Sequence, residues 1–268
     1  MSLLSYNLFQ QRQMTQEEIL EAIRELSDSD FSIFSIDEHG KIFCNLYNQL
    51  QKIDINPIFR DDFVCMIRKI IKHFLNKDIS REITLFLFLI FTKISTENCD
   101  MLLENVPDII SFIIHFIKWK KGGAIYIRKY YLIAMQISVI CPMMIPTFLE
   151  HMDIPQVKKL VGNDGNDSNI MFSIYNWIYH ISSHPCGIDF IMKEPEYFTK
   201  ILCELVKNTT LQIFFQKAIM TLENILRLEN QVIQEMTSSE ITGCVPNMMK
   251  VYFPSDLREK WDSVQKMF

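Results

Sequence analysis

Gln136-Ile137 lies near the end of a long apolar stretch, residues 124–140, and a polar residue followed by Leu or Ile marks the end of four comparable stretches elsewhere in the chain. The five copies are Gln49-Leu50, Lys93-Ile94, Gln136-Ile137, His180-Ile181 and Asn224-Ile225. Their apolar members are 44, 43, 44 and 44 residues apart. A period of this length without strand patterns is typical of stacked-helix solenoids, in which each unit buries its apolar face against the next. The repeat therefore predicts an all-α protein that binds other macromolecules.

The composition favours one large helical domain. The chain has 268 residues, and 49% of them are hydrophobic, including 20 Phe, which is enough to bury a large core. Only 7 Gly and 9 Pro are present, too few for the many tight turns of an all-β protein. We therefore expect a single elongated domain over residues 1–268.

Apolar residues at three- and four-residue spacing predict the individual helices. A first helical pair is expected at 37–53 and 61–76. Long helices that end near the repeated dipeptide are expected at 80–95, 124–140, 168–182 and 211–228. Short helices follow at 99–104, 143–150, 187–193 and 231–236. Medium helices come next, at 107–119, 155–161, 195–206 and 239–251.

The two ends of the chain are predicted to cap the repeats, which occupy 37–252. Thr15 and Glu18 form a capping-box pattern, so a helix is expected at 15–26 within an acidic N-terminal cap, residues 1–36. At the other end, residues 253–268 contain a more polar helix, as expected of a terminal unit with one face in solvent.

The order of short, medium and long helices resembles the armadillo repeat, with the HEAT repeat as its nearest relative. The passages that carry the resemblance are Lys93-Ile-Ser-Thr-Glu-Asn98 with Met101-Leu-Leu-Glu-Asn-Val-Pro-Asp-Ile-Ile110, and Leu222-Glu-Asn-Ile-Leu with Glu229-Asn230 and Val232-Ile-Gln-Glu235. It covers the chain from about residue 38 onward and depends on period and pattern, because the family's usual glycine after the short helix is missing. The resemblance implies a right-handed α-solenoid, an armadillo-like superhelix of about five three-helix repeats with a capping helix at each end.

In armadillo proteins the long helices line a concave groove, and the polar residue before the last apolar position points into it. The resemblance therefore implies a ladder of groove residues that hydrogen-bond the backbone of an extended peptide. Its members here are Lys93, Gln136, His180 and Asn224, with Gln49 as a fifth. Lys129 and Lys217 lie two helical turns before two of them and add charge. The plainer interpretation is that these are solvated positions at helix ends.

Nuclear-import receptors of this family place Trp four residues before an Asn of the ladder. That pattern is missing at each position, so we do not expect recognition of a nuclear-localisation signal.

Charge is unevenly distributed along the chain. The net charge of -5 argues against a general polyanion binder, because nucleic-acid affinity comes largely from Lys and Arg. However, no Asp or Glu occurs in residues 109–149, where Trp119, Tyr126, Tyr130 and Tyr131 lie among basic residues. The basic patch consists of Lys118, Lys120, Lys121 and Arg128. Such a stretch can bind acidic peptide, phosphate or single-stranded nucleic acid, although a charge run is often only a solvated face.

The remaining patterns do not indicate chemistry. His180 and His184 lie four residues apart with Cys186 close behind, but Ile181 stands where a zinc-protease motif needs Glu, and no second cysteine pair with metal-ligand spacing accompanies them. Residues 163–174 do not place a glycine and a closing glutamate where a calcium loop needs them, since Ile174 occupies the closing position. The sequence has no nucleophile elbow, phosphate-binding glycine loop or dinucleotide fingerprint. We therefore expect a non-enzymatic protein without a metal or cofactor.

The cysteines and apolar runs indicate an intracellular, cytoplasmic protein, with the nucleus as the alternative. The chain has 7 widely spaced Cys in apolar surroundings, which predicts reduced, buried thiols. The longest apolar runs are about nine residues, against roughly 20 needed to span a bilayer, so no membrane span is expected. Trp177 is expected to pack between helices.

The sequence thus predicts a non-catalytic scaffold that holds a protein or peptide ligand in its groove. The alternative is a nucleic-acid or phosphate-binding repeat protein that uses the basic aromatic stretch 118–131. A third class is a structural subunit buried in an assembly, and the sequence leaves the oligomeric state open.

Overall fold

The computed structural model describes residues 13–33, 35–75, 79–119, 123–164, 168–244, 246–247 and 255–267. All regular secondary structure in those ranges is helical, and they contain no β-strand. The all-α prediction is therefore confirmed. The chain divides into two compact units, the first ending at Cys141 and the second beginning at Pro142. Each unit has its own stack of helices.

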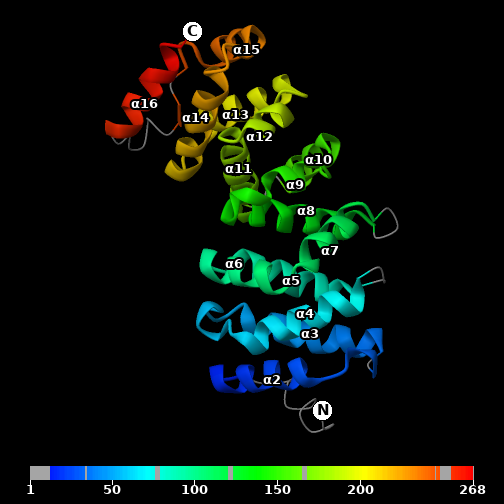
Figure 1. The fold of residues 1–268 in the computed structure, drawn as a ribbon. Helices are drawn as coiled ribbons and strands as arrows, with labels where there is room; N and C mark the ends of the chain where they lie inside the picture. The colour runs from blue at the N-terminus through cyan, green and yellow to red at the C-terminus, as the bar shows by residue number, and fades with distance from the viewer. Residues whose placement is uncertain are drawn as a thin grey trace. The chain divides into compact units, whose positions relative to one another are not determined.

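The first unit contains two layers of stacked helices (Figure 1). Its helices are α2 (Gln16–Asp28), η1 (Phe31–Ile33), α3 (Ile36–Leu50), η2 (Asn56–Ile58), α4 (Asp61–Phe74), α5 (Arg81–Lys93), α6 (Thr96–Asn105), α7 (Asp108–Ile117) and α8 (Gly123–Ile140). The long helices follow one another in one layer, since α3 packs on α5 and α5 packs on α8. In the other layer α2 packs on α4, and α4 packs on α7.

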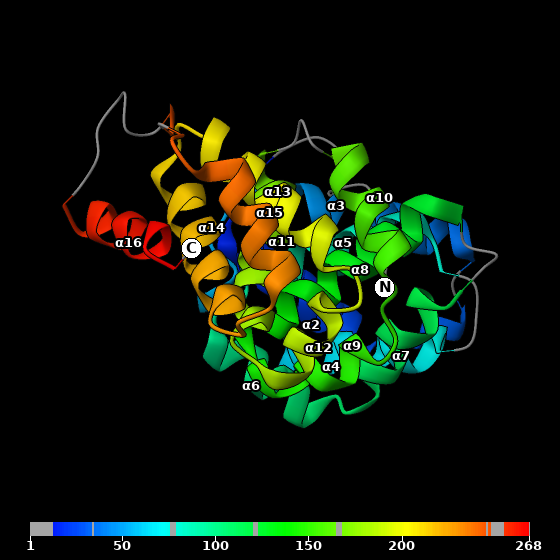
Figure 2. The same ribbon diagram turned by 90° about the horizontal axis from the view of Figure 1, so that it is seen from above.

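The second unit repeats this arrangement. Its helices are η3 (Pro142–Met144), α9 (Ile145–Leu149), α10 (Ile154–Asp164), α11 (Ser168–Ser182), α12 (Pro185–Ile191), α13 (Pro195–Asn208), α14 (Gln212–Leu226), α15 (Gln231–Ile241) and α16 (Ser255–Gln265). The long helix α11 packs on α14, which packs on α16. In the second layer α13 and α15 lie side by side (Figure 2).

The repeated dipeptide marks the same structural position in both units. Leu50, Ile137, Ile181 and Ile225 have 0% of their surface exposed, and Ile94 has 6%. Leu50, Ile137, Ile181 and Ile225 end a long helix or lie within its last turn, and Ile94 is the residue that follows the end of α5. The apolar member of each dipeptide is therefore a core residue, and its burial explains the period of the sequence.

Local hydrogen bonds explain why the helices begin where they do. Thr15 Oγ1 accepts a hydrogen bond from the Glu18 backbone N–H at 3.3 Å, and the Thr15 N–H donates to Glu18 Oε2 at 2.8 Å. This confirms the predicted capping box. Ser35 and Glu38 form a second capping box at the start of α3, which the sequence analysis missed.

One prediction about helix order is wrong in the last repeat. A short helix at 231–236 and a separate helix from Ser239 were expected, whereas α15 runs without a break to Ile241. Nothing between Met236 and Ser239 interrupts the backbone bonds, and the Thr237 hydroxyl donates to the Ile233 carbonyl at 2.6 Å within the helix. The helix ends before Gly243, whose φ of 72° lies in the left-handed region. Residues 242–244, 246 and 247 of the predicted helix are not α-helical, and the remaining residues, 245 and 248–251, lie outside the described residues.

Candidate functional site

Lys93 joins two successive long helices of the first unit. Its Nζ donates hydrogen bonds to the carbonyl oxygens of Leu50 at 3.0 Å, Gln51 at 2.7 Å and Ile53 at 2.9 Å. These carbonyls lie at and just beyond the C-terminus of α3, where backbone acceptors lack helical partners and the helix dipole favours a cation. All three ammonium hydrogens are thus used within the protein. The first predicted ladder residue therefore fixes the end of α3 relative to α5.

Asn56 strengthens this junction, and the sequence analysis did not identify it. Its Nδ2 donates to the Lys93 carbonyl at 3.2 Å, and its Oδ1 accepts from the Ser95 N–H at 2.7 Å. Its Oδ1 also accepts from Nδ2 of Asn98 at 3.1 Å. An Asn after a helix end has no distinctive local signal, so only the tertiary contact reveals this role.

Asn224 makes the equivalent connection in the second unit. Its Nδ2 donates to Ser182 Oγ at 2.9 Å and to Ser183 Oγ at 3.1 Å. The two serines lie at the end of α11, and Asn224 lies at the end of α14. In each unit, therefore, a polar residue near the end of one long helix bonds to the end of the preceding long helix.

The other ladder residues have different surroundings. Gln49 is buried, with 8% of its surface exposed, and its Oε1 accepts from the Met14 N–H at 3.0 Å. Gln136 is half-buried on α8, and no hydrogen bond to its side chain is found within the described part of the chain. His180 is half-buried on α11, where burial first and the charge of Lys217 second lower its pKa.

Two lysines lie over aromatic rings of the preceding long helix. Lys129 Nζ on α8 lies 4.2 Å from the centroid of the Phe88 ring on α5. Lys217 Nζ on α14 lies 4.1 Å from the centroid of the Tyr179 ring on α11. Each lysine comes seven residues before a ladder position, so the same cation–π contact occurs once in each unit.

Two aromatic residues of the basic stretch, Tyr130 and Tyr131, belong to the core, whereas Trp119 is half-buried and packs edge-on against Phe116. Tyr130 is 0% exposed and Tyr131 is 2% exposed, and the Tyr130 ring stacks on Phe116 with centroids 4.7 Å apart. These two rings therefore cannot stack on a nucleic-acid base in this structure. Lys118 is exposed at the end of α7, and Arg128 is half-buried. Lys120 and Lys121 lie outside the described residues.

Trp177 and the cysteines show where burial was predicted well and where it was not. Trp177 is 0% exposed and packs edge-on against Phe190 of α12, which confirms the prediction. All seven cysteines are free thiols, but only Cys99 and Cys203 are buried, and Cys44 is exposed. The prediction of general burial is wrong because apolar neighbours in the sequence do not specify which face of a helix a cysteine occupies.

His184 and Cys186 lie together at the start of α12. His184 Nδ1 is 3.1 Å from Cys186 Sγ. Among the residues that the structure describes, no group of three or more His, Cys, Asp or Glu side chains is arranged to hold a metal ion.

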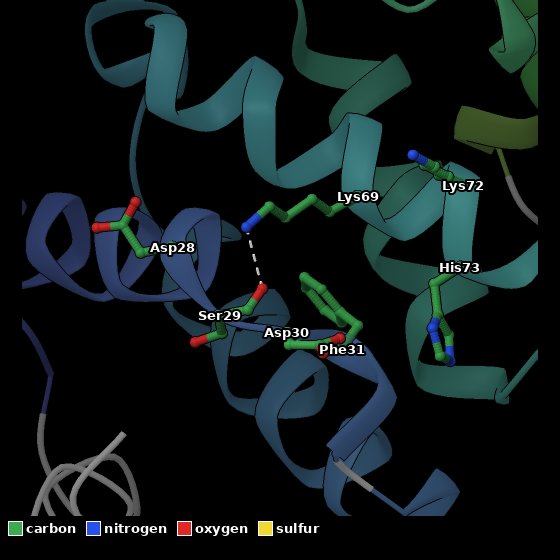
Figure 3. A pocket seen from close by; sticks show the side chains of 7 residues that line it. All are labelled: Asp28, Ser29, Asp30, Phe31, Lys69, Lys72 and His73. Atoms are coloured by element: carbon green, nitrogen blue, oxygen red, sulfur yellow. Dashed lines mark hydrogen bonds between the residues drawn. The ribbon is translucent and has the colours of Figure 1, made fainter.

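A pocket of about 450 Å³ in the first unit is lined by residues from the end of α2, from η1 and from α4 (Figure 3). The lining residues are Asp28, Ser29, Asp30, Phe31, Lys69, Lys72 and His73. Lys69 Nζ donates to the Ser29 carbonyl at 3.1 Å across the pocket (Figure 3). Its acidic and basic groups offset one another, and none of the predicted groove residues lines it.

The stability of the first unit is expected to fall as the pH decreases through about 6.5 because of His39. His39 is 1% exposed and stacks on Phe31, with His73 5.5 Å away. Burial first, and then His73, lowers the pKa of His39. The unfolded chain therefore takes up a proton before the folded chain does, so stability that is present above the unfolded pKa is lost below it. One such proton contributes at most about 1.4 kcal/mol per pH unit.

Thermal or urea unfolding between about pH 7.5 and 5.5 measures this dependence, with the variant His39→Gln as the reference. The neighbouring groups Glu38, Asp30, Lys69 and His73 are retained in that variant, so the difference between the two proteins reports His39 together with its charge interactions with His73 and Glu38. Equal pH slopes for the two proteins would rule out His39 as the cause.

Comparison with known proteins supports the fold. No protein-family model matches the sequence, and no curated protein matches it. Among solved structures, a designed armadillo repeat protein, YIII(Dq)4CqI, is similar with a TM-score of 0.50 and 13% sequence identity, over 98% of this chain and 98% of that chain. The chain therefore has an armadillo-like, all-α repeat fold, as the resemblance implied. Within the described residues, no helix is both long enough and apolar enough to cross a membrane.

Proposed function

We propose that this protein is a non-catalytic scaffold that binds an extended segment of a partner protein along its long helices. One observation carries the proposal. In each unit a polar residue at the end of one long helix is hydrogen-bonded to the end of the preceding long helix, as Lys93 is to α3 and Asn224 is to α11. These bonds fix α5 on α3 and α14 on α11, so within each unit an extended ligand can gain several modest contacts without reordering the receptor.

The ladder residues have different roles in this proposal. Lys93 positions the helices, since its hydrogens are already donated. Gln136 hydrogen-bonds directly to the backbone of the partner, because its side-chain amide can both donate and accept a hydrogen bond. Asn224 also positions the helices, since the hydrogens of its amide are donated to Ser182 and Ser183, and its Oδ1 can accept a hydrogen bond from the partner backbone. His180 lies at the corresponding place on α11. Lys129 and Lys217 supply positive charge on α8 and α14.

The burial of Tyr130 and Tyr131 favours a protein ligand over nucleic acid. Binding to single strands relies on exposed aromatic platforms and on many phosphate contacts. The long helices α5, α8, α11 and α14 contain two acidic residues, Glu82 and Glu223, and only five Lys and Arg residues, which is few for a site that must contact many phosphates. The affinity for the partner is therefore expected to depend weakly on salt concentration.

Replacing Gln136 and Asn224 together by alanine is expected to weaken partner binding while the fold is retained. Each hydrogen bond contributes about 0.5–1.5 kcal/mol, so the double variant should lose roughly 5- to 100-fold in affinity. The partner is first captured by proximity labelling, and its purified segment is then titrated by calorimetry. Far-UV circular dichroism checks the fold.

The matched control replaces Glu104 and Lys200 by alanine. Both side chains are exposed, and they lie on α6 and α13, which are not among the long helices. The control should bind like the parent chain. If the double variant also binds like the parent, the ladder has no role in recognition.

A further inference from the structure

Lys217 is a cation without an anionic partner among the described residues. It is half-buried on α14, and no described carboxylate lies within 4.0 Å of its Nζ. Its Nζ lies over the face of the Tyr179 ring, 4.1 Å from the ring centroid. Burial without a counter-ion lowers the pKa of Lys217. A bound anion would stabilise this ammonium, because the group is partly desolvated and has only an aromatic face beside it.

His180 lies next to this ammonium. Its ring is adjacent to that of Tyr179, with centroids 5.3 Å apart, and the charge of Lys217 opposes its protonation. A bound anion would reverse this opposition, because it attracts both the ammonium and the imidazolium. The pair therefore offers an anion one positive charge on Lys217 and a second one if His180 takes up a proton.

The other charged groups on the elements packed against α11 are already engaged or act elsewhere. Glu223 of α14 is paired with Arg227 at 2.5 Å. Lys158 of α10 is paired with Glu194, and Glu204 of α13 acts on Tyr175. On α12, the charge of Asp189 contributes to the raised pKa of Cys186. Lys159 of α10 is exposed to solvent. Lys217 is the charged group that acts on His180.

We propose that the Tyr179–His180–Lys217 corner binds a carboxylate of the partner segment and takes up a proton as it does so. The inference rests on the proposed function and specifies the partner as a segment with an acidic side chain at this position. A carboxylate fits better than a phosphate, because the site offers one permanent positive charge, and the helices α11 and α14 contain no arginine to form a bidentate clamp.

The pH dependence follows from the position of His180. In the free protein the imidazole is neutral at pH 7, since its pKa is lowered. A bound carboxylate raises that pKa, so protonation favours the complex. The affinity is therefore expected to increase as the pH falls through about 6.5 and to level off once the free imidazole is protonated as well.

The test uses two capped decapeptides, one of alternating glutamate and serine and one of alternating glutamine and serine. The imidazole signal of His180 is followed by NMR at millimolar peptide between about pH 8 and 5.5. The glutamate peptide should raise the pKa of His180 and bind about three- to tenfold more tightly than the glutamine peptide below about pH 6.5. The substitution Lys217→Gln should remove this preference, while His180→Gln should remove its pH dependence and keep the affinity measured at pH 8.

Three results would overturn the inference. The first is that the two peptides bind equally, and the second is that the His180 signal is unchanged at millimolar glutamate peptide. The third is that a phosphoserine peptide binds more tightly and still does so in Lys217→Gln.

The same titrations on the Gln136→Ala, Asn224→Ala variant separate the two proposals. If that variant weakens both peptides equally and Lys217→Gln has no effect, the groove remains and the carboxylate site is wrong. If only Lys217→Gln has an effect, the carboxylate site remains and the ladder is wrong.

Discussion

The substitution Ile181→Asp is expected to unfold the second unit. Ile181 has 0% of its surface exposed near the end of α11, where α12 turns back against it. A carboxylate placed there has no cation to pair with, and burial of an unpaired charge costs several kcal/mol. Since domains are stable by only about 5–15 kcal/mol, a loss of about 4 kcal/mol or more removes most of the folded population. Ile137→Asp should have the same effect on the first unit.

Urea unfolding followed by the fluorescence of Trp177 measures the loss, because this buried indole belongs to the same helix. The matched control is Ile213→Asp on α14, where the side chain is 49% exposed and the charge remains hydrated. The control should shift the midpoint little. A Trp177 transition unchanged by Ile181→Asp would show that the repeat register is wrong.

The substitution Gly187→Ala is expected to destabilise the second unit although alanine is the better helix former. A Cβ atom at Gly187 would lie 2.1 Å from the Ile181 carbonyl oxygen and 2.7 Å from the Ile181 Cβ. These are a backbone atom and a rigid branched side chain, so α12 must move away from α11. Such overpacking typically costs about 1–3 kcal/mol, which exceeds the helix-propensity gain of about 1 kcal/mol.

The matched control is Gly40→Ala in α3. There the nearest atom to the added Cβ is Oε2 of Glu82 at 3.2 Å, the end of a flexible side chain that can move. This variant should be neutral or slightly more stable in thermal unfolding, because the propensity gain is not offset. A Gly187→Ala protein that is as stable as the parent would mean that α12 does not pack closely on α11.

Part of the candidate site could be predicted from the sequence, and the limits have physical causes. The ladder positions were identifiable because each precedes a buried residue at a constant period. The partners of Lys93 and Asn224 were not, since the carbonyls at the end of α3 and beyond it, and the serines at the end of α11, lie forty or more residues earlier. The same holds for Asn56, whose bonds to Lys93 and Ser95 exist only once the repeats stack.

The amino-acid sequence by itself determined the helical fold, the period and the buried residue that ends each repeat, because apolar spacing and capping patterns act within a few residues of one another. Only the tertiary structure decided which polar groups bond to one another inside the protein, and that no carboxylate among the described residues lies beside Lys217. Hydrogen bonds and charges depend on what lies opposite in space. That is why Lys93 is engaged by three carbonyls, whereas Lys217 has an aromatic face and no described carboxylate beside it.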